Sequence, residues 1–182
     1  MKTPIDLYKI GEHLHFNDSR EITNGKRSEG ILTVDAGKSG PPPHRHMLQE
    51  EGFEILSGEM IAIVEGKEVV IKTGEKVIVK PGESHTFKNA SKSEKLVAKF
   101  WYEPALNMEW MLQTFGEAAM KHGGSWANVS VLMMMYVMYK ARKEYRIAGI
   151  PFWLQDVLLG FFAWLAEITG EAKKINLPDS LK

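Results

Sequence analysis

The sequence predicts a mainly β fold, an antiparallel barrel or sandwich, followed by a helical segment. From Gly30 to Tyr102, short runs of β-forming residues alternate with turn residues such as glycine, proline, serine and asparagine. After Pro104, longer apolar periodicities typical of helices replace these runs. We therefore divide the 182-residue chain into a β-barrel with a lead-in strand, residues 1–103, and a helical extension, residues 104–182, that packs on the barrel or on a partner subunit.

The predicted strands are joined by connections too short for crossover helices, so they are expected to pair antiparallel. A weak lead-in strand is predicted around Ile10–Phe16. The barrel strands are predicted at Ile31–Ala36, Gly52–Ser57, Met60–Glu65, Lys67–Lys72, Lys76–Val79, His85–Lys88 and Lys95–Tyr102. In the last strand, alternation places Tyr102 on the inward face, where we expect it to pack in the core.

About three helices are predicted in the extension. The first runs from about Asn107 to Lys121 and carries an apolar stripe at helical spacing. The second is expected from Asn128, as its N-cap, to Arg146, whose basic end suits the negative end of a helix dipole. The third follows Pro151, which a first helical turn tolerates, and ends near Gly170.

Charge and composition exclude several function classes. Lysine and arginine number 23, aspartate and glutamate also 23, so the formal net charge is zero and no nucleic-acid partner is expected. The absence of cysteine excludes disulfides, thiolate metal sites and a cysteine nucleophile. The first residues contain no apolar signal segment, so a cytoplasmic location is expected.

The most apolar part of the extension raises the question of a membrane. Residues 147–166 form an apolar stretch long enough to span a bilayer, but Gly149 and Pro151 interrupt its start and Asp156 lies near its centre. Contact with a membrane surface through residues 129–169 is also disfavoured, because the extension is almost neutral. We expect the helices to pack on the barrel or to form a homodimer interface. Met133–Met135 and Met138 could also line a pocket for an apolar ligand.

Histidines and glutamates are concentrated in one segment of the predicted barrel. His44 and His46 are two residues apart, so in a strand both imidazoles project from the same face. Alternation then favours Glu51 over Glu50 as their partner, because an inward Glu51 also turns the apolar Phe53 inward. The preferred carboxylate of this segment is therefore Glu51.

A further histidine follows in the next segment of this kind. His85 shares one face of its strand with Phe87, which places its imidazole on the apolar, inward side. Three neutral imidazoles and one carboxylate inside a barrel suit a divalent transition metal, and the same ligands accept iron, manganese, nickel, copper or zinc. Four protein ligands leave coordination positions free, as catalysis requires.

The spacing of these residues resembles the two motifs of the cupin superfamily. The first motif reads His44, His46, Glu51 and Gly58. The second reads Gly74, Gly82, His85 and Asn89. Lys80 occupies the usual proline position, and Gly37 and Gly40 flank the usual place of the first glycine. The resemblance covers roughly residues 30–102 and implies a double-stranded β-helix, or jelly roll, with His44, His46, Glu51 and His85 as metal ligands.

The resemblance implies a class of protein rather than one reaction, since fold alone does not give function. Cupins with this ligand set include dioxygenases and isomerases. We expect a mononuclear-metal enzyme acting on a small molecule, with a quercetinase-like dioxygenase as the leading class and Glu51 as a catalytic base. The alternatives are a non-catalytic small-ligand-binding or sensor cupin, and a sugar or small-molecule isomerase.

Three other candidates have simpler interpretations. His13 and His15 form a second H-x-H pair, but no carboxylate follows at a useful spacing, so a surface or edge strand is expected. Arg45 points away from its two histidine neighbours and is expected to be solvated or ion-paired.

Overall fold

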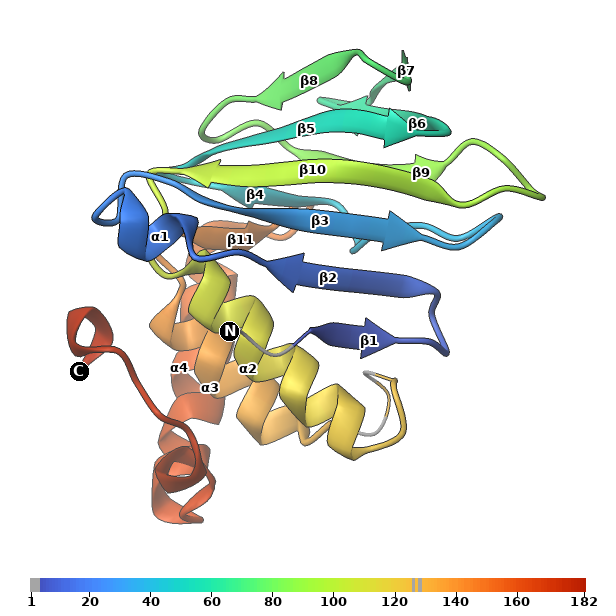
Figure 1. The fold of residues 1–182 in the computed structure, drawn as a ribbon. Helices are drawn as coiled ribbons and strands as arrows, with labels where there is room; N and C mark the ends of the chain where they lie inside the picture. The colour runs from blue at the N-terminus through green and yellow to red at the C-terminus, as the bar shows by residue number, and fades with distance from the viewer. Residues whose placement is uncertain (1–3, 126, 128) are drawn as a thin grey trace.

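The computed structural model describes residues 4–125, 127 and 129–182, and its strands form two antiparallel sheets that face each other as a barrel (Figure 1). The first sheet has the strand order β1-β2-β3-β10-β5-β8. Its strands are β1 (Ile5–Leu7), β2 (Glu12–Phe16), β3 (Ser28–Val34), β10 (Leu96–Glu103), β5 (Glu50–Ser57) and β8 (Lys76–Val79). The mainly β, antiparallel fold with a helical extension is confirmed.

The second sheet has the order β11-β4-β9-β6-β7. Its strands are β11 (Tyr145–Ile147), β4 (His44–His46), β9 (His85–Asn89), β6 (Glu59–Val64) and β7 (Lys67–Lys72). Every predicted strand is present to within a few residues, while β1 and the short helix α1 (Ser19–Ile22) were not predicted. Strand β11 was not predicted either, and it joins the barrel from within the helical extension.

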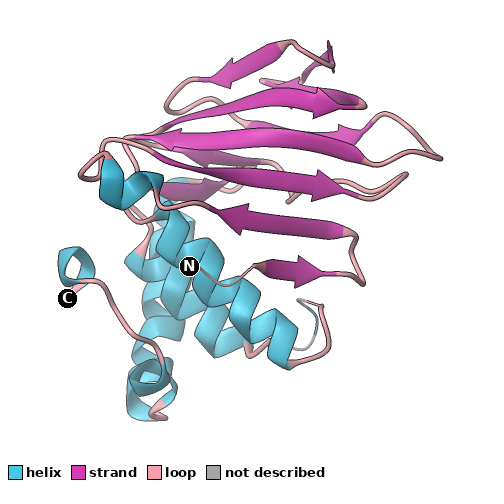
Figure 2. Cartoon of the chain, in the orientation of Figure 1, coloured by secondary structure: helices cyan, strands magenta, loops and turns pink. Residues whose placement is uncertain are grey.

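The extension forms a separate layer of helices beside the β1 end of the first sheet (Figure 2). It contains the α-helices α2 (Met108–Lys121), α3 (Val131–Lys140) and α4 (Phe152–Ile168), and the short 3-10 helices η2 (Glu171–Lys174) and η3 (Asp179–Leu181). Within the described residues, no helix has the length and apolarity that a membrane span needs. The face of α4 that points away from the molecule exposes Trp153, Val157, Phe161 and Trp164, and the expected homodimer stays a prediction.

The predicted second helix was wrong at its C-terminal end. Helix α3 ends at Lys140 rather than at Arg146. The residues that follow form a turn and then β11, because Tyr145 and Ile147 pair with β4 instead of continuing the helix. At the other end, the predicted N-cap Asn128 lies outside the described residues, and the Ser130 side chain accepts a hydrogen bond from the Met133 backbone N–H at 3.4 Å.

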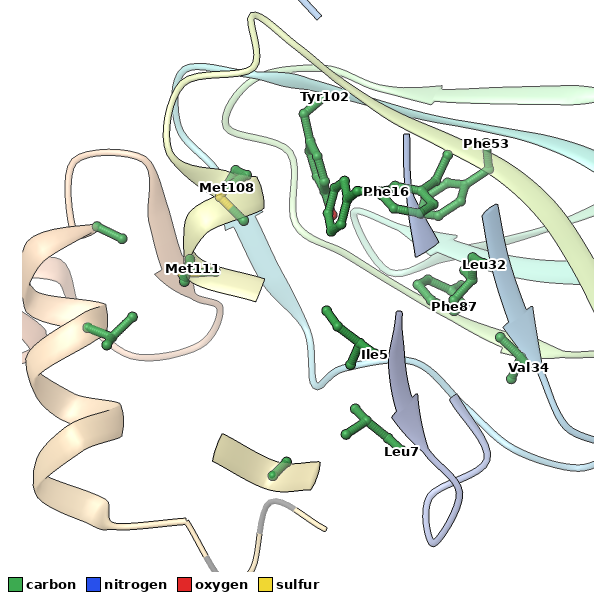
Figure 3. Packing of buried hydrophobic residues seen from close by; sticks show 14 of the residues in the cluster. Ile5, Leu7, Phe16, Leu32, Val34, Phe53, Phe87, Tyr102, Met108 and Met111 are labelled. Atoms are coloured by element: carbon green, nitrogen blue, oxygen red, sulfur yellow. The ribbon is translucent and has the colours of Figure 1, made fainter. Parts of the chain in front are cut away.

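One apolar core joins the barrel to the helices. Figure 3 shows Ile5 and Leu7 on β1, together with Met108 and Met111 on α2, close to the barrel residues. A β-carbon placed on Gly116 of α2 would lie only 2.5 Å from Cγ2 of Ile5, so this glycine permits the close approach of helix and strand.

A buried hydrogen-bond network also ties the extension to the barrel. The Glu144 carboxylate accepts hydrogen bonds from Gln49 Nε2 at 2.7 Å and from the Asn107 backbone N–H and Nδ2 at 2.9 and 2.6 Å. The Glu144 carbonyl oxygen accepts a further bond from the Met47 N–H at 2.7 Å. Because all three polar side chains are buried, these bonds fix the residue that directly precedes β11.

Candidate metal centre and its cavity

Three strands bring four predicted site residues together inside the barrel. His44 and His46 lie on β4, Glu51 on β5, and His85 on β9 directly opposite His44 in the strand register. All four side chains are buried, and each offers a ligand atom within 4.8 Å of the others. His44 Nε2 lies 3.2 Å from His46 Nε2, and Glu51 Oε2 lies 2.5 Å from His85 Nε2 and 3.4 Å from His46 Nε2.

Strand alternation accounts for this convergence. His44 and His46 are buried on either side of the half-buried Arg45, and His85 and Phe87 are buried on either side of Thr86. On β5, Glu51 turns inward together with Phe53, as alternation predicts. Glu50 turns the other way and its Oε1 lies 3.4 Å from Nε1 of Trp101. The turn before β9 contains Gly82 at a φ of 84°, a backbone conformation that favours glycine.

Backbone carbonyls orient two of the imidazoles. His44 Nδ1 lies 2.9 Å from the Pro42 carbonyl oxygen, and His85 Nδ1 lies 3.2 Å from the Glu83 carbonyl oxygen. A carbonyl can only accept, so each Nδ1 donates a proton to it, and Nε2 is the nitrogen that faces the cluster. This is the outer hydrogen bonding that holds metal-ligating histidines in place. His46 Nδ1 has no hydrogen-bond partner in the described part of the chain.

The protonation states of His44 and Glu51 suit a cation. Burial, reinforced by the nearby His46 and His85, lowers the pKa of His44 to about 3, so its imidazole is neutral near pH 7. Burial alone would raise the pKa of Glu51, but the same two histidines outweigh it and hold that pKa well below the ordinary value. A neutral imidazole and an ionised carboxylate are the forms that bind metals. The group therefore fits a metal ion.

Two tyrosines complete the walls of the cluster. The ring of Tyr145, from β11, stacks on His44 with a centroid separation of 5.0 Å and an interplanar angle of 28°. Tyr102 lies 5.2 Å from His46 between ring centroids. Burial, together with the charge of Glu51 and a hydrogen bond to it, raises the pKa of Tyr102 well above its usual value. The core position predicted for Tyr102 is confirmed. Its hydroxyl also forms a hydrogen bond with Glu51 of the cluster.

A cavity of about 500 Å³ opens beside His44, His46 and Glu51. Strands β1, β2, β3, β4, β5, β9 and β10 line it on the barrel side, and helices α2 and α3 and strand β11 line it on the side of the extension. Met134 and Met138 are among its walls, whereas Met133 and Met135 are not, so the pocket-lining alternative is confirmed for two of the four methionines and wrong for the other two. The helical extension therefore forms one wall of the space in front of the cluster.

Sequence reasoning missed Glu12 and Tyr145. Glu12 on β2 lines the cavity and is 8% exposed. Burial, and to a lesser degree the charge of Glu51, raises its pKa to about 7. The sequence did contain a sign of this, since strand alternation places Glu12 on the same face as the apolar Leu14 and Phe16 of the lead-in strand. For Tyr145 the sequence contained no comparable sign, because this residue was predicted to lie in the second helix.

The remaining candidates lie where the sequence predicts. His15 is exposed, and His13 pairs with Asp6 at 2.8 Å on the surface, away from the buried cluster. Arg45 forms an ion pair with Glu65 at 2.6 Å. Within the described residues, the group formed by His44, His46, Glu51 and His85 is the one arrangement of three or more such side chains close enough to hold a metal.

Comparisons with known proteins agree with this fold. The family model described as "Cupin domain" matches residues 30–101. A predicted oxalate decarboxylase from Thermotoga maritima is similar to the chain, with 24% identity, a TM-score of 0.51, and coverage of 57% of this chain and 93% of that one. Residues 30–101, the strand-rich part of this protein, are thus a domain of the cupin superfamily.

Two further structures give lower scores. The cupin domain of Cnp3 from Schizosaccharomyces pombe has 21% identity and a TM-score of 0.45, and the match covers 51% of this chain and 64% of that one. A sugar phosphate isomerase of the cupin superfamily from Silicibacter pomeroyi has 15% identity and a TM-score of 0.44, with 51% and 59% covered. No curated protein matches the chain. At these identities the likeness concerns the fold alone.

Proposed function

We propose that this protein is a metal-dependent cupin enzyme that acts on a small molecule bound in the cavity, with oxygenase chemistry of the quercetinase-like dioxygenase class. The observation that carries the proposal is the position of the buried donor cluster, since His44, His46 and Glu51 also line the cavity. A molecule in the cavity would thus lie next to the donors. Structural metal sites are closed, whereas catalytic ones keep an open side of this kind.

The residues of the chain have separate roles in this proposal. His44, His46, His85 and Glu51 would hold the cation, which when bound supplies Lewis acidity toward substrate oxygen. Glu51 lies at the cavity wall, and in this proposal its carboxylate is the base that accepts a proton from a substrate group. The Tyr102 hydroxyl donates a hydrogen bond that orients Glu51. The apolar walls exclude water from the reacting groups.

Metal content is the first test of the proposal. Wild-type protein reconstituted separately with iron, manganese, nickel, copper or zinc should retain one of them in a fixed ratio to the chain after dialysis. The His85→Ala variant should lose it, because one of four converging ligands is removed. His15→Ala is the matched control, since its imidazole is exposed and lies outside the cluster. Retention by His85→Ala equal to that of His15→Ala would contradict the proposal.

Turnover separates an enzyme from the alternative, a non-catalytic ligand-binding cupin. The large apolar cavity supports that alternative too, because a binding protein needs the same enclosed space. Metal-loaded protein should consume oxygen with at least one member of a panel of flavonoids, catechols and diketones. Binding of panel members in calorimetry, with neither oxygen uptake nor product, would favour the binding protein.

A further inference from the structure

We propose that the cavity selects a molecule with a neutral, apolar body, whose oxygen donors are confined to the end that meets His44, His46 and Glu51. Molecules with an anionic group at the far end, such as sugar phosphates or long-chain dicarboxylates, are excluded. The inference rests on the proposed function for the metal-facing end of the ligand. The selection of the apolar body follows from the cavity walls alone.

The walls supply apolar contact over most of the cavity. Barrel side chains such as Leu32 and Phe53 face methionines of the extension, among them Met111 and Met134. A volume of about 500 Å³ lies in the range of sites that enclose a whole small molecule. A very small dianion would leave most of this apolar space unfilled, whereas an apolar body would fill it and remove its own apolar surface from water, which is favourable.

The charged groups in the cavity argue against an anionic body. No lysine or arginine among the described residues lines it, whereas the carboxyl groups of Glu12 and Glu51 both do. A phosphate or sulfonate placed among these walls would be buried without a partner of opposite charge, which is costly. A bound divalent cation would offset a negative charge only beside its own ligands and not at the opposite end.

The extension provides the residues with which this selection can be changed. Met134 and Met135 are neighbours in α3 and both are half-buried, but Met134 lines the cavity and Met135 does not. A lysine at position 134 would place an ammonium group within reach of the cavity, whereas a lysine at position 135 adds the same charge to the same helix outside it. The two substitutions therefore form a matched pair.

The test compares two fluorescent probes that differ by one sulfonate, neutral N-phenylnaphthylamine and anilinonaphthalene sulfonate, on metal-free protein. Wild-type protein should bind the neutral probe at least about tenfold more tightly. Met134→Lys should reduce this preference by about tenfold or more, and Met135→Lys should leave it unchanged. Met138→Trp, which fills part of the cavity without adding charge, should weaken both probes. Thermal unfolding of each variant verifies that it is folded.

Several outcomes would overturn the inference. Equal or tighter binding of the sulfonate to wild-type protein would do so, as would a loss of preference in Met135→Lys as large as that in Met134→Lys. The exposed apolar face of α4 could bind both probes, but that contribution is the same in the matched variants. Because the measurement uses metal-free protein, a failure here is distinct from a failure of the metal proposal, which the metal-content test detects.

Discussion

Replacement of Glu12 by glutamine should stabilise the metal-free protein at alkaline pH and have little effect in acid. The side chain is 8% exposed and lies in the cavity wall on β2. Burial, and secondarily the charge of Glu51, raises the pKa of Glu12 from 4.5 to about 7. Glutamine has nearly the same shape but cannot ionise, so the variant removes the charge and keeps the packing.

The sign of the effect follows from proton binding. In the unfolded chain Glu12 releases its proton near its ordinary pKa of 4.5, whereas in the folded chain it keeps the proton up to about pH 7. Between these values the folded state binds more protons, so the stability of the wild-type protein falls as the pH rises. The difference between these two pKa values corresponds to a loss of folding stability on the order of 3 kcal/mol. The loss reaches its full size once the pH exceeds the pKa of Glu12 in the folded chain.

Urea denaturation across this pH range measures the difference directly. Glu12→Gln should gain up to about 3 kcal/mol over wild type above pH 8 and almost nothing below pH 4. Glu117→Gln, at an exposed position of α2, is the control and should show no gain in stability at either pH. A gain that is the same in acid and in base would refute the reasoning, because an uncharged effect of packing has no pH dependence.

The remaining predictions concern residues of the extension. Glu144→Ala leaves three N–H donors without their acceptor and should lower the free energy of unfolding in urea by about 3 kcal/mol. Gly116→Ala should destabilise the protein by about 1–2 kcal/mol, because the added methyl group clashes with β1. Gly160→Ala should stabilise it by up to about 1 kcal/mol, because the added methyl group would lie 3.7 Å from its nearest neighbour, an ordinary contact. Thermal unfolding of both variants tests this, and the opposite order of their melting temperatures would contradict it. Tyr145→Ala should weaken metal binding about tenfold in a chelator competition, and Tyr145→Phe should not.

The barrel and the donor cluster could be predicted because their information is local. Alternation within β5 is enough to choose Glu51 over Glu50, and the two-residue spacing of His44 and His46 places both on one face. The pairing of β4 with β9 then brings His85 opposite His44. Each step depends on residues close in sequence and on the regular geometry of strands.

Contacts between distant segments could not be predicted in the same way. Tyr145 reaches His44 only because β11 pairs with β4, across about a hundred residues of sequence. A three-residue strand has too short a pattern to be distinguished from the end of the preceding apolar helix. The place of Glu12 in the cavity depended on β2 lying beside β3, so its inward phase alone did not make it a candidate site residue.

The two parts of the chain contribute different components to the site. The four convergent donors all come from barrel strands, which is the part of the chain that the cupin family model matches. The methionines that face the cavity and the tyrosine that stacks on His44 come from residues 104–182, beyond that match. Membership of the superfamily therefore informs the metal-binding end of the site but not the shape or polarity of the space in front of it. Since those walls decide which molecule reaches the donors, the ligand has to be inferred from the extension of this chain rather than from proteins that share the barrel.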